Sequence, residues 1–373
     1  MYICDELNYL LTSIAIPFMI HNFNAGPSVL PKEVFEKSAE AVLNYNNSGL
    51  SILEIGHRTS VFTAIMEEAR SLVKELMQLD SDHQVLFLHG GASTQFMQVP
   101  MNLIDTKETA SYADTGVWSS KAIKEAKLFG NIDVVCSSKE KNYSFIPKDF
   151  AVPNDAKYFH ITTNNTIFGT QWPTIPQTSN VMVADMSSDI FSRQLDFNTF
   201  GLIYAGAQKN MGPAGVTLVI VNQQILGKIK RPIPAIMDYR NHIAEGSMLN
   251  TPPVFSVYVC LLTLRWLKSM GGIAAIEKLN NEKAALLYKE IDENELFTSQ
   301  VNTDDRSRMN VCFTMKDSSL ENSFYEFAQQ RGIIGIKGHR LSGGFRASLY
   351  NALPVNSVKS LIETMQDFKK LYI

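Results

Sequence analysis

Several features that mark other classes of protein are missing from this chain of 373 residues. Its four cysteines are scattered, with no CxxC pair and no metal-type Cys/His spacing, which favours reduced thiols in a cytoplasmic protein. The net charge is -3, so the chain lacks the strongly basic surface that binds nucleic-acid phosphates. It also has no GxxxxGK[ST] phosphate loop. These absences still allow a local cationic pocket for a small anion.

Long hydrophobic runs are absent as well. No segment reaches 18 uninterrupted apolar residues, so no membrane span is expected. The N-terminal segment "LLTSIAIPFMI" is short, and Asp5 and Glu6 precede it where a signal peptide has basic residues. We expect residues 1–20 to form an extension outside the main fold, with Met19 as a candidate native start. The composition, 45% hydrophobic and 19% charged, is ordinary for a soluble globular protein with a sizeable core.

Strand-like apolar segments alternate with helical patterns between about residues 60 and 225, which is typical of a doubly wound α/β domain. The predicted strands cover residues 84–88, 109–114, 132–138, 157–163 and 180–185 and the two apolar runs that flank residue 209, and a helix is predicted over residues 94–104. From about residue 252, two helical segments, short strands and a terminal helix indicate a smaller α+β domain. We therefore expect a large domain over residues 21–251 and a small one over 252–373, with ligands at the carboxyl ends of the strands.

One lysine stands in an unusual place. Lys209 lies in the turn of "GLIYAGAQKNMGPAGVTLVIV", residues 201–221, between two apolar runs. Burial lowers the pKa of an amine, and a neutral amine can form a Schiff base with an aldehyde. The position therefore suits covalent binding of pyridoxal phosphate. The simpler interpretation is a lysine whose stem packs while its head reaches water.

Two further segments strengthen the cofactor hypothesis. Asp185 ends the apolar run "VMVAD", where a carboxylate can pair with the pyridine nitrogen of the cofactor or cap the next segment. The segment "LHGGASTQF", residues 88–96, places two glycines between a strand and an apparent helix. Free N–H groups at such a helix start can bind phosphate, although many turns of this kind bind nothing.

Aromatic and cationic residues follow other predicted strands. Trp118 can stack on a planar ring or belong to the core, and Thr166 can bond a ring hydroxyl, a phosphate or its own turn. Arg346 lies in an apolar strand-like run, where it needs a carboxylate or phosphate partner or forms a structural ion pair. Cations also occur in polar or Gly-rich loops at His57, Arg58, His339 and Arg340. Together they fit a substrate with more than one anionic group.

Seven motifs occur in the order found in one known family: "HNFNAGPSVLP", "EIGHRTS", "GGASTQF", "ADMSSD", "AGAQKNMGPAGV", "NTPPVFSVY" and "KGHRLSGGFRASLYN". On these motifs the chain resembles the phosphoserine aminotransferases, class V enzymes of fold type I that depend on pyridoxal phosphate. The resemblance runs from about residue 21 to the C-terminus. It implies a mostly parallel seven-stranded sheet, a smaller α+β C-terminal domain, and a homodimer with active sites at the subunit interface.

The resemblance also implies the residues that bind the cofactor. Lys209 would hold it covalently and shuttle the proton, and Asp185 would pair with its pyridinium nitrogen. Trp118 would stack on the ring and Thr166 would bond the 3-hydroxyl. The cofactor phosphate would be bound by Ala92, Ser93 and Gln208, with Asn250 and Thr251 reaching it from the second subunit. The arginine that some members carry in the "GGAS" loop is absent here.

The substrate residues implied by the resemblance are cationic. Arg346 would bind the α-carboxylate, and Arg340, assisted by His57 and Arg58 of the second subunit, would bind the phosphate, with His339 as a further candidate. The implied reaction transfers the amino group of L-glutamate reversibly to 3-phosphohydroxypyruvate, giving O-phospho-L-serine and 2-oxoglutarate in serine biosynthesis. Some relatives also form 4-phosphohydroxy-L-threonine in vitamin B6 synthesis.

Three alternatives stay open at this point. A cysteine desulfurase needs a nucleophilic cysteine in a mobile loop, whereas Cys312 lies in an apolar strand pattern typical of a core. A serine–glyoxylate transaminase would leave the cationic cluster without a purpose. A non-catalytic α/β protein that binds a phosphorylated ligand would tolerate Lys209→Ala.

Overall fold

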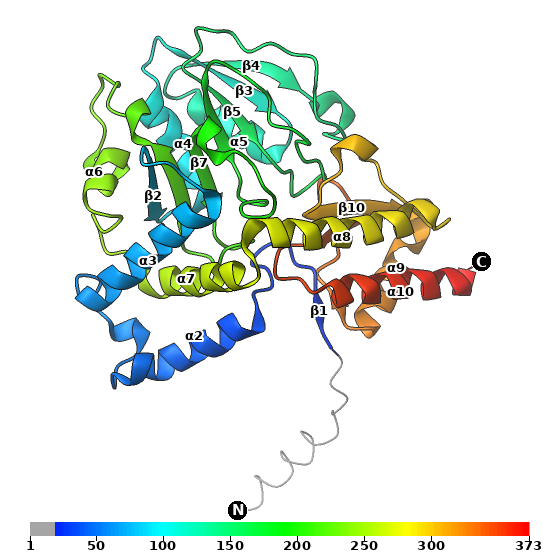
Figure 1. Ribbon diagram of the computed structural model, residues 1–373. Coiled ribbons are helices and arrows are strands. Elements are labelled where there is room, and N and C mark those ends of the chain that lie inside the picture. The colour runs from blue at the N-terminus through cyan, green and yellow to red at the C-terminus, as the bar shows by residue number, and fades with distance from the viewer. Residues whose placement is uncertain (1–18, 373) are drawn as a thin grey trace, which may run out of the picture.

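A seven-stranded sheet is the main sheet of the computed structural model, which describes residues 19–372, and its strands lie in the upper part of Figure 1. The strand order is β2-β8-β7-β6-β5-β3-β4. The strands are β2 (His83–Leu88), β3 (Thr109–Asp114), β4 (Asn131–Ser137), β5 (Tyr158–Thr162), β6 (Val181–Asp185), β7 (Phe200–Gly206) and β8 (Thr217–Asn222). Strand β8 is antiparallel to β2 and β7, whereas the other neighbours are parallel. The prediction of a mostly parallel sheet is confirmed.

Six of the seven strands are buried along most of their length, which explains why most of them are rich in apolar residues, whereas the edge strand β4 is largely exposed. Because successive side chains of a strand point to opposite faces, Val85 and Phe87 join one apolar cluster while Leu86 and Leu88 join another. The first cluster is completed by α2 (Lys32–Asn44), α3 (Ser60–Met77) and α7 (Val254–Ser269). The second is completed by α4 (Gly91–Leu103), α5 (Val117–Ala126) and α6 (Tyr239–Ala244).

A smaller group of strands and helices follows in the C-terminal part of the chain. An antiparallel sheet consists of β12 (Phe345–Ser348), β10 (Asn310–Met315) and β9 (Phe297–Thr298), and β1 (His21–Asn22) pairs in parallel with β11 (Ile333–Ile334). The helices of this part are α8 (Gly272–Glu293), α9 (Glu321–Gln330) and α10 (Val355–Tyr372). They pack around a third apolar cluster, to which the N-terminal Phe23 also belongs.

Helix α8 belongs to both parts of the fold. Its first turns contribute Ile273 and Ile276 to the cluster on the large sheet. Its later turns contribute Leu287 and Ile291 to the C-terminal cluster. Figure 1 shows α8 following α7 and running beside α10, with which it packs. The division into two domains at residue 252 stays a prediction.

Most of the N-terminal extension predicted over residues 1–20 lies outside the described residues, which begin at Met19. Met19 and Ile20 are exposed and lead into β1. Among residues 19–372, no single helix is long and apolar enough to cross a membrane. Helices α7 and α8 reach the necessary length and hydropathy only when they are taken together, and the pair is bent by 82°. The same residues contain no group of three or more His, Cys, Asp or Glu side chains placed to hold a metal ion.

Candidate active site

Lys209 lies in the connection between the antiparallel strands β7 and β8, and its side chain is buried, with 9% exposed. The connection folds back on itself because the Gly212 N–H donates to the carbonyl of Ala207 over 2.9 Å. The segment after β1 holds it from outside, since the Ser28 hydroxyl donates to the Lys209 carbonyl. Gly26 has a φ of +139°, and a Cβ there would lie 3.4 Å from the Lys209 side chain. The backbone around the lysine is therefore fixed by contacts from a distant segment.

The amine of Lys209 faces a polar, partly aromatic space. Its Nζ donates to the Thr166 hydroxyl over 2.8 Å and lies 5.9 Å from the centroid of the Trp118 ring. Burial lowers the pKa of Lys209 to about 8, although the carboxylate of Asp185 opposes this shift and the charge of Arg346 adds to it. A substantial fraction of the amine is therefore neutral near physiological pH and able to attack an aldehyde.

Asp185 ends β6 at the carboxyl edge of the sheet and is 4% exposed. Burial raises the pKa of its carboxyl group, and the charge of Lys209 works against that shift. The Ser187 N–H donates to its Oδ1 over 2.9 Å and fixes its orientation. A second buried carboxylate, Asp189, lies one turn further on and accepts bonds from Thr163, Gln171 and Arg193.

The glycine pair predicted to bind phosphate forms the start of α4. Gly90 and Gly91 have φ values of +94° and +66°, a left-handed backbone that other residues rarely adopt. The helix therefore begins at Gly91, three residues before the predicted start, with Ala92 half-buried and Ser93 exposed in its first turn. No acidic side chain occupies that turn, so its free N–H groups can receive an anion.

Asn250 and Thr251 are exposed, and a hydrogen bond to the Thr251 backbone connects them to the loop that precedes α4. The His89 Nε2 bonds to the Thr251 carbonyl over 2.8 Å within the same chain. Gln208 is half-buried next to Lys209, and its side chain folds back over Gly206. The proposed contacts of these residues with a phosphate stay predictions.

Trp118, Thr166 and Arg346 all lie near the Lys209 amine. Trp118 is half-buried on the first turn of α5, and its Nε1 has no hydrogen-bond partner among the described residues. On β12, Arg346 donates from Nη1 to the Thr166 carbonyl over 3.2 Å, while its buried Nε has no partner in residues 19–372. Its guanidinium therefore keeps donors for an anion.

His339 and Arg340 lie on the loop between β11 and β12. The pKa of His339 is lowered by burial and by the charges of Arg346, Arg340 and Lys121, which places these four side chains in one region. His57 and Arg58 precede α3, the first half-buried and the second exposed, and neither forms an ion pair within residues 19–372. The structure thus brings Arg346 near Lys209 and His339 near Arg346 and Arg340. Within residues 19–372 no hydrogen bond or ion pair joins His57 or Arg58 to these cations.

Sequence reasoning missed some residues of this site. Lys121 lies outside the seven motifs, yet its Nζ is 4.6 Å from the centroid of the Trp118 ring. Its position three residues after Trp118 on a helix was the available signal. Ser28 and Gly26 were quoted only within a motif, because nothing in the sequence indicates that they contact the lysine turn.

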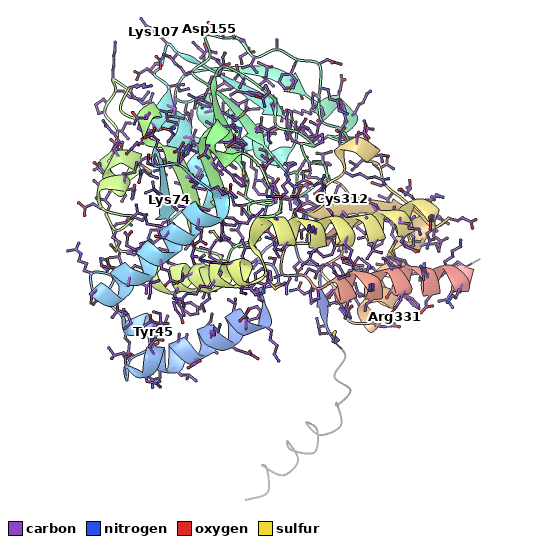
Figure 2. The ribbon with its side chains drawn as sticks, viewed as in Figure 1. Tyr45, Lys74, Lys107, Asp155, Cys312 and Arg331 are labelled. Carbon is purple, nitrogen blue, oxygen red and sulfur yellow. The ribbon has the colours of Figure 1, made fainter. Side chains whose placement is uncertain are left out.

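Cys312 lies on β10 (Figure 2), in register with Arg346 on β12. Its Sγ donates to the Ile167 carbonyl over 3.5 Å. Burial raises the pKa of this thiol to about 12, although Arg346 acts in the opposite direction. A thiol held in its protonated form is a poor nucleophile, so the structure gives no support to a cysteine desulfurase.

The arrangement of a buried lysine, a strand-end carboxylate and a glycine-rich helix start agrees with the comparisons with known proteins. Residues 20–361 match the family described as Aminotransferase class-V. The chain therefore belongs to the class-V aminotransferases, as the motifs predicted.

Close relatives within that family share one name. The phosphoserine aminotransferase of Flavobacterium psychrophilum is 57% identical over 350 residues, which cover 94% of this chain and 98% of the relative. That of Flavobacterium johnsoniae is 58% identical over 347 residues, covering 93% and 98%.

Solved structures of the same name have the same fold. The phosphoserine aminotransferase of Bacillus circulans subsp. alkalophilus aligns with a TM-score of 0.92 at 41% identity, over 95% of this chain and 99% of the other. The pyridoxal-phosphate-bound enzyme of Trichomonas vaginalis aligns with a TM-score of 0.88 at 35% identity, over 93% and 99%. The predicted fold class and family are confirmed.

Proposed function

We propose that this chain is a phosphoserine aminotransferase, which transfers the amino group of L-glutamate reversibly to 3-phosphohydroxypyruvate and gives O-phospho-L-serine and 2-oxoglutarate. The observation that carries the proposal is the buried Lys209, whose pKa of about 8 and contacts with Thr166 and Trp118 suit covalent binding of an aldehyde cofactor. The relatives named above support the substrate assignment.

The residues present fit pyridoxal phosphate. Asp185 supplies a buried carboxylate for the ring nitrogen, and Trp118 supplies an aromatic face whose own N–H is unpartnered in residues 19–372. The N–H groups after Gly91, with Ser93 and Gln208, would hold the phosphate. When bound, the cofactor supplies an aldehyde for covalent attachment and a protonated ring that withdraws electrons from the substrate α-carbon.

The remaining chemistry belongs to side chains of this chain. Lys209 Nζ holds or moves the proton at the substrate α-carbon, for which its lowered pKa is suited. Arg346 binds the α-carboxylate, because its Nη1 is anchored at the Thr166 carbonyl while its other donors stay free. His339 and Arg340 face the distal group of the substrate. The same cations serve the phosphate of phosphoserine and the side-chain carboxylate of glutamate.

We also propose a homodimer in which His57 and Arg58 of one subunit complete the site of the other. The segment from α2 to the start of α3, which contains both residues, exposes a set of large apolar side chains. They are Phe35, Leu43, Leu50, Leu53 and Val61, between 40% and 83% exposed. A concentrated apolar surface of this kind is typical of a protein interface. In the same arrangement Asn250 and Thr251 would reach the cofactor phosphate of the partner.

Two proposals concern the organisation and location of the protein. A large cofactor-binding domain over residues 21–251 and a small domain over 252–373 are supported by separate apolar clusters, with α8 contributing to both. A cytoplasmic location is supported by the three described cysteines, all of which are free thiols.

The proposed function is tested by the absorbance spectrum of the cofactor-loaded protein. We expect O-phospho-L-serine to convert the Schiff-base band into that of the aminated cofactor at a far lower concentration than L-serine or L-alanine. A band that responds better to an unphosphorylated amino acid would refute the substrate assignment. A protein with no Schiff-base band would refute the role of Lys209.

A further inference from the structure

We infer that Lys121 is a specificity-determining residue that binds the distal anionic group of the substrate, together with Arg340 of the same subunit. The inference rests on the proposed function and adds to it a cation that no motif contains. Lys121 lies on the second turn of α5, and its side chain is exposed.

The direction of the Lys121 side chain is the first observation. Glu125 follows it by four residues, at the spacing of helical ion pairs, yet no ion pair joins the two. The Lys121 Nζ lies instead 4.6 Å from the centroid of the Trp118 ring, one turn back toward the start of the helix. The Lys121 amine therefore contacts the Trp118 ring, which also lies near Lys209, and does not pair with Glu125.

The position of the amine relative to Lys209 is the second observation. The Lys209 Nζ lies 5.9 Å from the same ring centroid, so the two distances place the amines at most about 10.5 Å apart. Phosphoserine separates its reacting α-carbon from its phosphate by only a few bonds. A phosphoserine molecule whose α-carbon lies near Lys209 can thus extend its phosphate toward Lys121.

The third observation is the lack of compensating charge. The positive charges of Lys121, Arg340 and Arg346 all lower the pKa of His339. None of these three cations lies within 4 Å of a carboxylate in the part of the chain that the structure describes. Arg346 donates to the Thr166 carbonyl, and Thr166 accepts from Lys209, whereas Lys121 and Arg340 are exposed. An uncompensated cationic group of this kind attracts a dianion more strongly than a monoanion.

The test compares Lys121→Met with Lys124→Met in the cofactor-loaded enzyme. Lys124 is an exposed lysine on the same helix, six residues after Trp118, and serves as the matched control. We expect Lys121→Met to raise KM for O-phospho-L-serine about tenfold, to raise KM for L-glutamate less, and to leave kcat within about twofold. Lys121→Arg should restore KM to within about threefold of wild type, since it keeps the charge.

Salt provides a second readout that a merely structural role would not change. KM for phosphoserine should rise less steeply with ionic strength in Lys121→Met than in wild type. Equal KM values in both Met variants, or a loss of kcat with KM unchanged, would overturn the inference. A wild-type enzyme that does not prefer the phosphorylated substrate would instead refute the proposed function, so the two failures are distinguishable.

Discussion

A buried lysine outside the site gives a prediction whose size follows from the structure. Lys283 on α8 is 1% exposed, and its Nζ donates to the carbonyls of Leu349 and Tyr350 over 2.8 Å each. These carbonyls follow β12, the strand that carries Arg346. Burial lowers the pKa of Lys283 from 10.5 to about 7. The folded protein therefore releases this proton at a much lower pH than the unfolded chain.

The sign of the pH dependence follows from that difference. Between about pH 7 and pH 10.5 the unfolded chain binds more protons at Lys283 than the folded protein does, so this residue makes stability rise with pH across the window. Below pH 7 the charged form must be buried, and the full destabilisation is present. Between pH 7.5 and pH 9.5 the contribution of Lys283 to the free energy of unfolding should rise by about 2.5 kcal/mol, at about 1.4 kcal/mol per pKa unit.

The assay is urea unfolding of wild type and Lys283→Met at those two pH values, at equal protein and cofactor concentration. The Met substitution also changes packing and leaves two carbonyls without a donor, but these effects are largely the same at both pH values and cancel in the comparison. The stability difference, wild type minus variant, should increase by about 2 to 3 kcal/mol from the lower to the higher pH. The exposed Lys278→Met on the same helix should show no such increase. A difference that stays flat for Lys283→Met would refute the reasoning.

Three further predictions concern the site. Asp185→Ala should lower the steady-state kcat by at least about a hundredfold while the Schiff-base band persists, because the cofactor ring loses its charge partner. A variant that keeps the wild-type kcat would contradict this role. Arg346→Lys should raise KM for both amino-acid substrates about tenfold, since the two-pronged contact with the α-carboxylate is lost; unchanged KM values would place that carboxylate elsewhere. Lys209→Ala and Arg58→Ala should each be inactive alone, and equal mixing after subunit exchange should restore about a quarter of wild-type activity, whereas no restoration would show that sites are not shared between subunits.

Much of the large sheet could be predicted from the chain because most of its strands are buried and several form apolar runs in the sequence. The runs ending at Asp185 and flanking Lys209 are strands within a residue or two of the expected limits. The start of α4 was predicted three residues late, because a glycine pair reads as a turn and does not show that its left-handed backbone can begin a helix at Gly91.

Long-range contacts were beyond the sequence because no local pattern encodes them. The contact of Ser28 with the Lys209 carbonyl joins segments 181 residues apart. The position of β8 between β2 and β7 likewise depends on how the strands of the whole sheet assemble. Lys121 could not be predicted for a different reason: an exposed lysine on a helix is ordinary, and its sequence position does not show that its amine lies against Trp118 and not against Glu125.

The central claim is that Lys209 holds the cofactor and gives it up to a phosphorylated amino acid. Borohydride reduction of the loaded enzyme, followed by peptide mass spectrometry, tests both halves at once. We expect the reduced cofactor on Lys209 in the enzyme alone, and its loss from that peptide when O-phospho-L-serine, but not L-serine, is added before reduction. A label on another lysine, or a label on Lys209 that phosphoserine leaves unchanged, would contradict the account.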